Sequence, residues 1–177
     1  MLLTKIKAGS VLIAEPSIIG DSSFHRSVVM IANHDDEGSV GFILNKPLSY
    51  TLSDIIPSIV SEFRIFNGGP VEQDNLYFIH NVPDLVPNSV EIVNGIYWGG
   101  DFELVTKLIE ENVINEDNVK FFLGYSGWGK EQLSDELYTN SWAVSEASIK
   151  GIISVPSLDL WKNQMMALGG ELSLIHI

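Results

Sequence analysis

Aromatic and amide side chains gather in the glycine-rich stretch Gly124-Tyr125-Ser126-Gly127-Trp128-Gly129 and at Gln132 just beyond it. The apolar residues 119–123 are typical of a strand, and Leu133 and Leu137 recur at helical spacing. We therefore predict a strand, a glycine turn and a helix, whose first N–H groups face a loop too glycine-rich to cover them. Such an opening suits an anion or a polar ligand flanked by Tyr125 and Trp128. Alternatively, the two aromatic residues only plug the turn against the core.

Two other kinds of chemistry fit the sequence less well. Ser126 is offset by one residue from the Gly-x-Ser-x-Gly pattern of a nucleophile elbow, and spacing identifies no histidine partner for Ser126 or Ser27. A metal site would need three histidines and the acidic pair Asp35 and Asp36, but their spacing is not that of known ligand sets. The histidines concerned are His25, His34 and His80. We assign no catalytic residue, no metal and no cofactor.

The elements around these residues alternate short strands with a few helices. Strands are expected at residues 10–14, 27–34, 39–45, 76–80, 89–93, 96–98, 142–144 and 151–155, with hairpins about residues 35–38 and about Asn94-Gly95. Thr51 begins a short helix, and a helix from Ser157 ends at Gly169-Gly170. Asp101 caps a longer helix with one apolar stripe, formed by Phe102, Val105, Leu108, Ile109 and Val113. This mixture favours an α+β domain.

Composition narrows the class of protein further. The 177 residues include 23 acidic and 10 basic side chains and no cysteine, giving a net charge of −13. A phosphate backbone would be repelled, so we predict no direct binding to nucleic acid. The sequence has neither a disulfide framework nor an apolar run long enough for a membrane span or signal peptide. We therefore predict a cytoplasmic protein with no membrane association.

The last six residues, 172–177, are treated separately. The codons CTG TCT CTT ATA CAC ATC would encode them and also spell a transposon end used in preparing sequencing libraries. We expect a single domain over residues 1–171, followed by a non-native tail at 172–177. The alternative is an ordinary C-terminal strand.

Six motifs, in order, resemble the AlgH/YqgE family of bacterial proteins from about residue 9 to about residue 170. They are Gly-x-Val-Leu-Ile-Ala-x-Pro at 9–16, Phe24-His25-Arg26-Ser27-Val28-Val29, His34 with Gly38, Gly41-Phe42-Ile43-Leu44-Asn45-Lys46-Pro47, Gly68-Gly69-Pro70-Val71, and the stretch from Gly124 to Gly129 with Gln132-Leu133 and Glu136-Leu137. The resemblance implies an α+β fold whose bifurcated, mostly antiparallel β-sheet folds into a pseudo-barrel with several flanking helices. It also implies a cytosolic protein of a family often labelled as transcriptional regulators, with no agreed catalytic assignment.

The positions that match these motifs supply the candidate ligand-binding residues. We place them around one cleft: Arg26, His34, Asn45, Gly69, Tyr125, Trp128 and Gln132. Our leading hypothesis is a non-enzymatic regulator that acts on transcription indirectly and binds a small anionic or polar ligand, or a protein partner. The alternative is a hydrolase or transferase that holds an anionic metabolite on Arg26 and the helix N-terminus, with His34 as general base. The sequence does not indicate the oligomeric state.

Overall fold

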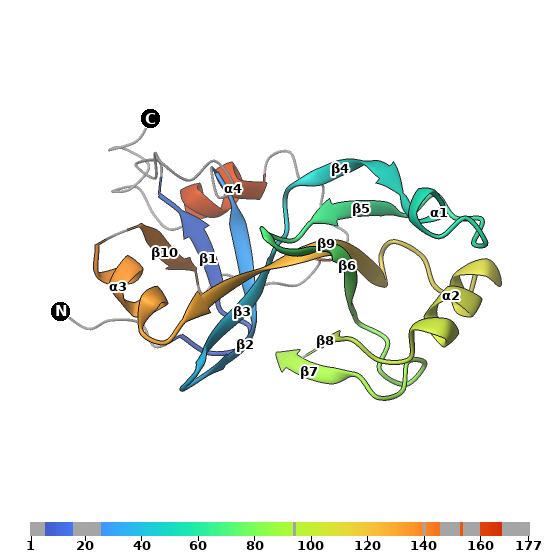
Figure 1. Ribbon diagram of the computed structural model, residues 1–177, viewed down its shortest axis with the longest axis horizontal. Helices are drawn as coiled ribbons and strands as arrows, with labels where there is room; N and C mark the ends of the chain where they lie inside the picture. Colours follow the sequence, from blue (N-terminus) through green and yellow to red (C-terminus); the bar gives the residue numbers. More distant parts are fainter. Residues whose placement is uncertain are drawn as a thin grey trace.

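The computed structural model describes residues 6–15, 26–93, 95–139, 141–145, 153 and 160–167. These residues form ten strands and four helices (Figure 1). The strands are β1 (Val11–Ala14), β2 (Val28–Asp35), β3 (Gly38–Ile43), β4 (Pro47–Thr51), β5 (Arg64–Asn67), β6 (Val71–His80), β7 (Val90–Val93), β8 (Ile96–Trp98), β9 (Val119–Gly129) and β10 (Trp142–Ser145). The helices are α1 (Leu52–Ile55), α2 (Phe102–Glu110), α3 (Gln132–Tyr138) and α4 (Leu160–Ala167).

The fold is α+β, and its sheet is mostly antiparallel and branches at β9. The main path runs β10-β1-β2-β3-β9-β6-β8-β7, while β5 pairs with β9 in parallel and carries β4 on its other edge. The predicted bifurcated sheet is therefore confirmed. Within the described residues the sheet stays open, because its end strands β10 and β7 do not pair with each other.

The branching divides the molecule into two lobes that share β9 (Figure 1). The first lobe contains β1, β2, β3 and β10 with α3 and α4, and the second contains β4 to β8 with α1 and α2. The C-terminal half of β9 pairs with β3, whereas its N-terminal half lies between β5 and β6. One long strand therefore fixes how the two lobes meet.

The prediction of a glycine turn after residue 123 is wrong, because β9 continues as a strand to Gly129. Gly124 has a positive φ of 76°, and the pairing of β9 with β6 is interrupted between Val71 and Leu76, so the strand bends here without ending. At the same place β9 contacts the Gly68-Gly69 segment, where Ser126 Oγ donates a 3.0 Å hydrogen bond to the Gly68 carbonyl. The glycines allow two backbones to approach closely.

The helices cover apolar faces of the two lobes. In α2, Val105 and Ile109 are buried among the core residues of the second lobe and Phe102 and Leu108 pack against them, as the predicted stripe requires. Leu133 of α3 packs in the core of the first lobe. Val113 does not join the stripe, because α2 ends at Glu110 and the chain then turns at Asn112, whose φ is 59°.

Other predicted elements are confirmed with changed boundaries or lie outside the described residues. The β2–β3 and β7–β8 hairpins are present, and the Thr51 N–H bonds to Asp54 Oδ2 at 2.8 Å in the predicted cap of α1. Strands β4 and β5 were not predicted. The tail at 172–177, the beginning of the last helix and nearly all of the strand expected at 151–155 lie outside the described residues.

Candidate functional site

A groove of about 440 Å³ opens between the β2–β3 hairpin and the glycine-rich end of β9. We call it the hairpin groove. The hairpin contributes Asn33, Asp35, Glu37, Gly38, Ser39 and Val40; β6 contributes Val71; and β9 contributes Tyr125, Gly127, Trp128 and Gly129. Its volume lies in the usual range for small-ligand sites.

The floor of the hairpin groove consists largely of backbone. Gly127 pairs with Val40, and Gly129 pairs with Gly38. Since side chains alternate between the two faces of a strand, Tyr125, Gly127 and Gly129 share one face, on which only Tyr125 has a side chain. A Cβ on Gly127 would meet Tyr125 Cε2 at 3.4 Å and Val71 Cγ2 at 3.9 Å. The groove therefore exists because residue 127 has no side chain.

The rim of the hairpin groove is polar and acidic. Asp35 accepts hydrogen bonds from the Glu37 N–H at 2.8 Å and from Asn33 Nδ2 at 3.3 Å, and these three side chains are exposed. Among the described residues that line the groove, none is lysine, arginine or histidine. The groove can accept hydrogen bonds and attract a cation, and it offers no positive charge to an anion.

Tyr125 forms the aromatic wall of the hairpin groove. Its ring packs edge-on against Tyr77 at a centroid distance of 5.7 Å, and the Tyr77 hydroxyl donates a 2.7 Å hydrogen bond to Glu72 Oε2. Burial, followed by the bond to Glu72, raises the pKa of Tyr77. Tyr125 lines the hairpin groove and lies on the same face of β9 as Gly127. It is thus the predicted site residue whose side chain faces the groove.

Trp128 lines the hairpin groove through its backbone, whereas its side chain lies on the opposite face in the core of the first lobe. Its ring packs edge-on against Trp142, and both indole N–H groups donate to Glu136 Oε1, at 3.2 Å from Trp128 and 2.8 Å from Trp142. Gln132 Nε2 donates to the other oxygen of Glu136 at 3.1 Å. This carboxylate therefore fixes α3 against β9 and β10.

The helix end that was predicted to receive an anion begins at Gln132, which does not line the hairpin groove. The Gly129 N–H donates to Gln132 Oε1 at 2.9 Å, and the residue before α3 is Glu131, in the left-handed conformation. His34 also lies on the Trp128 face of the sheet, since it pairs with Ser39, which pairs with Trp128; its Nδ1 is 2.6 Å from Ser39 Oγ. The His34 ring is exposed.

Arg26 and Asn45 lie at the far end of the β2–β3 pair. Arg26 precedes β2, and the seven residues 27–33, which are mostly extended strand, separate it from His34 by roughly 25 Å. Its guanidinium carbon is 5.3 Å from the centroid of the Trp161 ring, which belongs to α4. Asn45 accepts from the Val28 N–H and donates to the Arg26 carbonyl, both at 2.9 Å. The structure therefore brings neither residue to the hairpin groove.

Gly69 packs closely against the backbone of β9 at Tyr125. Its φ of 152° suits glycine alone, and a Cβ there would overlap the Tyr125 carbonyl. Ser126, the serine considered as a nucleophile, is fully buried, and its hydroxyl donates a hydrogen bond to the Gly68 carbonyl.

The metal hypothesis also finds no cluster of ligands. Among the residues that the structure describes, no three metal-ligating side chains lie together, and His25 is outside that part of the chain.

Two buried bases in the second lobe have displaced pKa values. Burial lowers the pKa of Lys120 to about 8; its Nζ lies 3.9 Å from the centroid of the Phe66 ring. Burial also lowers the pKa of His80, whose Nδ1 accepts a hydrogen bond from the Val82 N–H. Neither residue lines the hairpin groove, so these shifts concern stability rather than the site.

Sequence reasoning missed Asn33, Asp35, Glu37 and Gly127 as groove residues. The sequence indicates only a hairpin about residues 35–38, and it places Gly127 in a turn. Their shared face depends on the pairing of β3 with β9, about 90 residues apart in the chain. Asp35 and Glu37 beside Gly38 were the only signal in the sequence. They indicate a groove only once β3 is known to pair with β9.

A family model described as AlgH-like matches residues 11–173. Relatives named UPF0301 protein include one from Cytophaga hutchinsonii, 39% identical over 176 residues, which covers 98% of this chain and 94% of the relative. Another, from Bacteroides thetaiotaomicron, is 38% identical over 165 residues and covers 92% and 83% of the two chains.

Solved structures share the fold. The crystal structure of protein DIP2367 from Corynebacterium diphtheriae has a TM-score of 0.81 at 22% identity and covers 100% of this chain and 95% of that one. The solution structure of the AlgH protein from Pseudomonas aeruginosa has a TM-score of 0.76 at 24% identity, with coverages of 99% and 96%. Within the described residues, no helix is long and apolar enough to cross a membrane.

Proposed function

This chain belongs to the AlgH-like family, and from that premise we propose that it is a cytosolic, non-enzymatic protein that binds a small polar ligand in the hairpin groove. Any effect on transcription is indirect, because a chain of net charge −13 is repelled by the phosphate backbone of DNA.

One observation carries the proposal: an exposed glycine, Gly127, leaves a hollow between an aromatic side chain and an acidic rim. A glycine floor lets a flat ligand approach the backbone, and Tyr125 offers a ring edge beside it. Asp35 and Glu37 then accept hydrogen bonds from the ligand. This chemistry selects a small, flat molecule that is rich in N–H groups and is neutral or cationic.

The enzyme hypothesis has less support from this geometry. It combines Arg26, His34 and the N-terminus of α3, yet Arg26 is about 25 Å from His34 along β2, and Gln132, where α3 begins, does not line the hairpin groove. An anionic metabolite would also face Asp35 and Glu37. The described part of the hairpin groove supports binding of a polar ligand better than catalysis on an anion.

A thermal-shift screen tests the proposal. Amines, guanidines, nucleobases and nucleosides are compared with phosphorylated and carboxylated metabolites, because a ligand that binds the folded state raises the melting temperature. We expect stabilisation by at least one compound of the neutral or cationic group and none by the anions. In Gly127→Leu the new side chain occupies the groove, so the same compound should give no shift. Stabilisation by anions alone, or equal shifts in both proteins, contradicts the proposal.

A further inference from the structure

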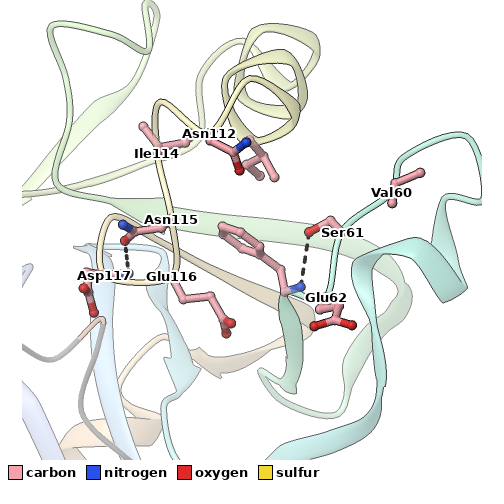
Figure 2. Close-up of a pocket in the computed structure, with 10 residues that line it drawn as sticks. Val60, Ser61, Glu62, Asn112, Ile114, Asn115, Glu116 and Asp117 are labelled. Atoms are coloured by element: carbon pink, nitrogen blue, oxygen red, sulfur yellow. Dashed lines mark hydrogen bonds between the residues drawn. The ribbon is translucent and has the colours of Figure 1, made fainter.

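A second hollow, of about 430 Å³, lies in the other lobe between residues 60–63 and residues 109–117. We call it the α2 groove (Figure 2). It lies between the loop that leads from α1 to β5 and the loop that leads from α2 to β9, at the end of the molecule away from the β2–β3 hairpin (Figure 1). It therefore shares no residue with the hairpin groove.

The α2 groove has apolar side chains in its lining, and two of them, Phe63 and Val60, are accessible. Ile109 and Ile114 are buried core residues at its base, and the half-buried Phe63 ring is held edge-on against Phe121 at 5.8 Å. At its edge the side chain of Val60 is 89% exposed. Val60 and the exposed part of Phe63 therefore offer apolar surface for contact with another molecule.

The turn after α2 leaves a second apolar side chain unburied beside the α2 groove. Asn112 adopts a left-handed φ of 59°, and Val113, which belongs to the apolar stripe by sequence, becomes 51% exposed. Single exposed apolar residues are ordinary on protein surfaces. Val113 follows Asn112 and precedes Ile114, which both line the hollow, but Val60 is the exposed valine that lines it.

The charge at the α2 groove is acidic. Glu62, Glu116 and Asp117 line it and are exposed, and none of its described lining residues is basic. Figure 2 shows the carboxylates of Glu62 and Glu116 turned to the same side of the hollow, away from Asn112 and Ile114. Glu116 Oε2 accepts a long 3.4 Å bond from the Arg64 N–H, which leaves its other oxygen for an external donor. A cation is the complementary group.

We infer that the α2 groove docks a segment of a partner protein in which a lysine or arginine is next to an apolar residue. The cationic side chain lies between Glu62 and Glu116, and the apolar side chain packs on Phe63 and Val60. Side-chain pockets that recognise neighbouring residues of an extended segment are a common mode of peptide recognition. A second copy of this chain is a poor occupant, because two chains of net charge −13 repel each other.

Peptide binding measured by fluorescence polarisation tests this inference. The probe is a labelled hexapeptide with alternating lysine and leucine between glycine ends. Matched peptides replace either lysine by glutamate or leucine by glycine. We expect saturable binding of the first peptide alone, weakening as salt rises from about 50 mM to about 200 mM. Absence of saturable binding, or equal binding of the glycine-substituted peptide, overturns the inference.

Two double variants distinguish peptide binding at the α2 groove from attraction to the net negative charge of the whole protein. E62K with E116K reverses the charges that line the groove and should weaken binding at least about tenfold. D36K with D135K makes the same change in net charge on the first lobe and should leave binding within about twofold. Circular dichroism and thermal unfolding verify that both variants fold. Equal weakening by the two double variants would show attraction to net charge and overturns the inference.

The apolar contact is tested by V60S, which changes an exposed side chain and should weaken peptide binding about fivefold with an unchanged melting temperature. Sedimentation of the free protein tests whether a second copy of this chain occupies the α2 groove instead. A dimer that V60S dissociates would overturn docking of a partner segment. Failure of these peptide experiments would not contradict the proposed ligand binding in the hairpin groove, because the two hollows share no lining residue.

Discussion

The predicted site residues have two different kinds of role in the folded protein. Tyr125 presents its side chain to the hairpin groove, and Trp128 contributes backbone there. Asn45, Gln132 and Gly69 have structural partners: strand β2, the Glu136 carboxylate and the crossing with β9, respectively. Binding of a ligand by these residues remains a prediction, and the hairpin groove suggests that Tyr125 is the member to test first.

The role of Asn45 illustrates why residue types alone mislead. An amide before Lys46-Pro47 at a strand end can bind a ligand or fix neighbouring backbone. Here it bonds to the Val28 N–H and the Arg26 carbonyl, 17 and 19 residues away in the chain. Sequence shows that such a residue needs partners but cannot show that the protein itself supplies them.

Lys120 is buried in β9, and its burial makes the stability of the protein depend on pH. Its pKa in the folded protein, about 8, is below its usual value of 10.5. Between these values the unfolded chain holds a proton that the folded chain lacks, so stability rises as pH rises from about 8 to about 10.5. Below about pH 8 both states are protonated, and the cost of burying the charge is constant.

We therefore expect Lys120→Met to be more stable than the parent protein at pH 7, by on the order of 2 kcal/mol, because it removes the buried charge. The advantage should shrink as pH rises through the window from about 8 to about 10.5. Urea unfolding at several pH values measures both effects. Lys107→Met is the control, since Lys107 is 71% exposed and pairs with Glu111 at 3.9 Å. A pH-independent difference between Lys120→Met and the parent would contradict this account.

At the scale of elements, the sequence predicts local structure well and long-range pairing poorly. The β2–β3 hairpin, the cap of α1 and the apolar stripe of α2 depend on residues close in the chain, and all are present. Strand β5 was missed because it is stabilised by parallel pairing with β9, more than 50 residues later. The length of β9 was missed for the same reason: glycines that would end an isolated strand are tolerated between pairing partners.

Glycines in and around β9 serve two purposes, and a matched pair of substitutions separates them. Gly69→Ala places a Cβ against the Tyr125 carbonyl at a φ of 152° and should destabilise the protein by about 3 kcal/mol. Gly127→Ala meets only ordinary contacts, so its stability should stay within about 0.5 kcal/mol of the parent. Chemical denaturation measures both. Equal costs for the two variants would contradict the assignment of Gly127 to an open floor.

At the scale of the whole molecule, β9 joins two lobes that each carry an acidic hollow. The hairpin groove lies mainly in the first lobe, with Val71 of β6 at its border, and the α2 groove lies in the second lobe. Within the described residues, no basic side chain lines either hollow. The net charge of −13, which the sequence shows, is thus reflected in the acidic lining of both hollows. Sequence also indicated the α+β class and the family, because its motifs are spread along nearly the whole chain.

The position of the candidate site could be predicted only in part. The sequence pointed to the stretch from Gly124 to Gly129, of which Tyr125, Gly127, Trp128 and Gly129 line the hairpin groove. It placed Arg26 and a helix N-terminus here, whereas the structure places Asp35 and Glu37 here and Arg26 beside Trp161. Which residues face the groove depends on the alternation of side chains along β9, and that depends on β9 being a continuous strand.

The most direct measurement is isothermal titration calorimetry of the strongest stabilising compound with Asp35→Asn and Asp36→Asn. Both residues are exposed and adjacent on the same hairpin, but only Asp35 lines the hairpin groove. We predict that Asp35→Asn weakens binding about tenfold or more, through loss of a charged hydrogen-bond acceptor. Asp36→Asn should bind like the parent protein. Equal affinities in the two variants would contradict the account.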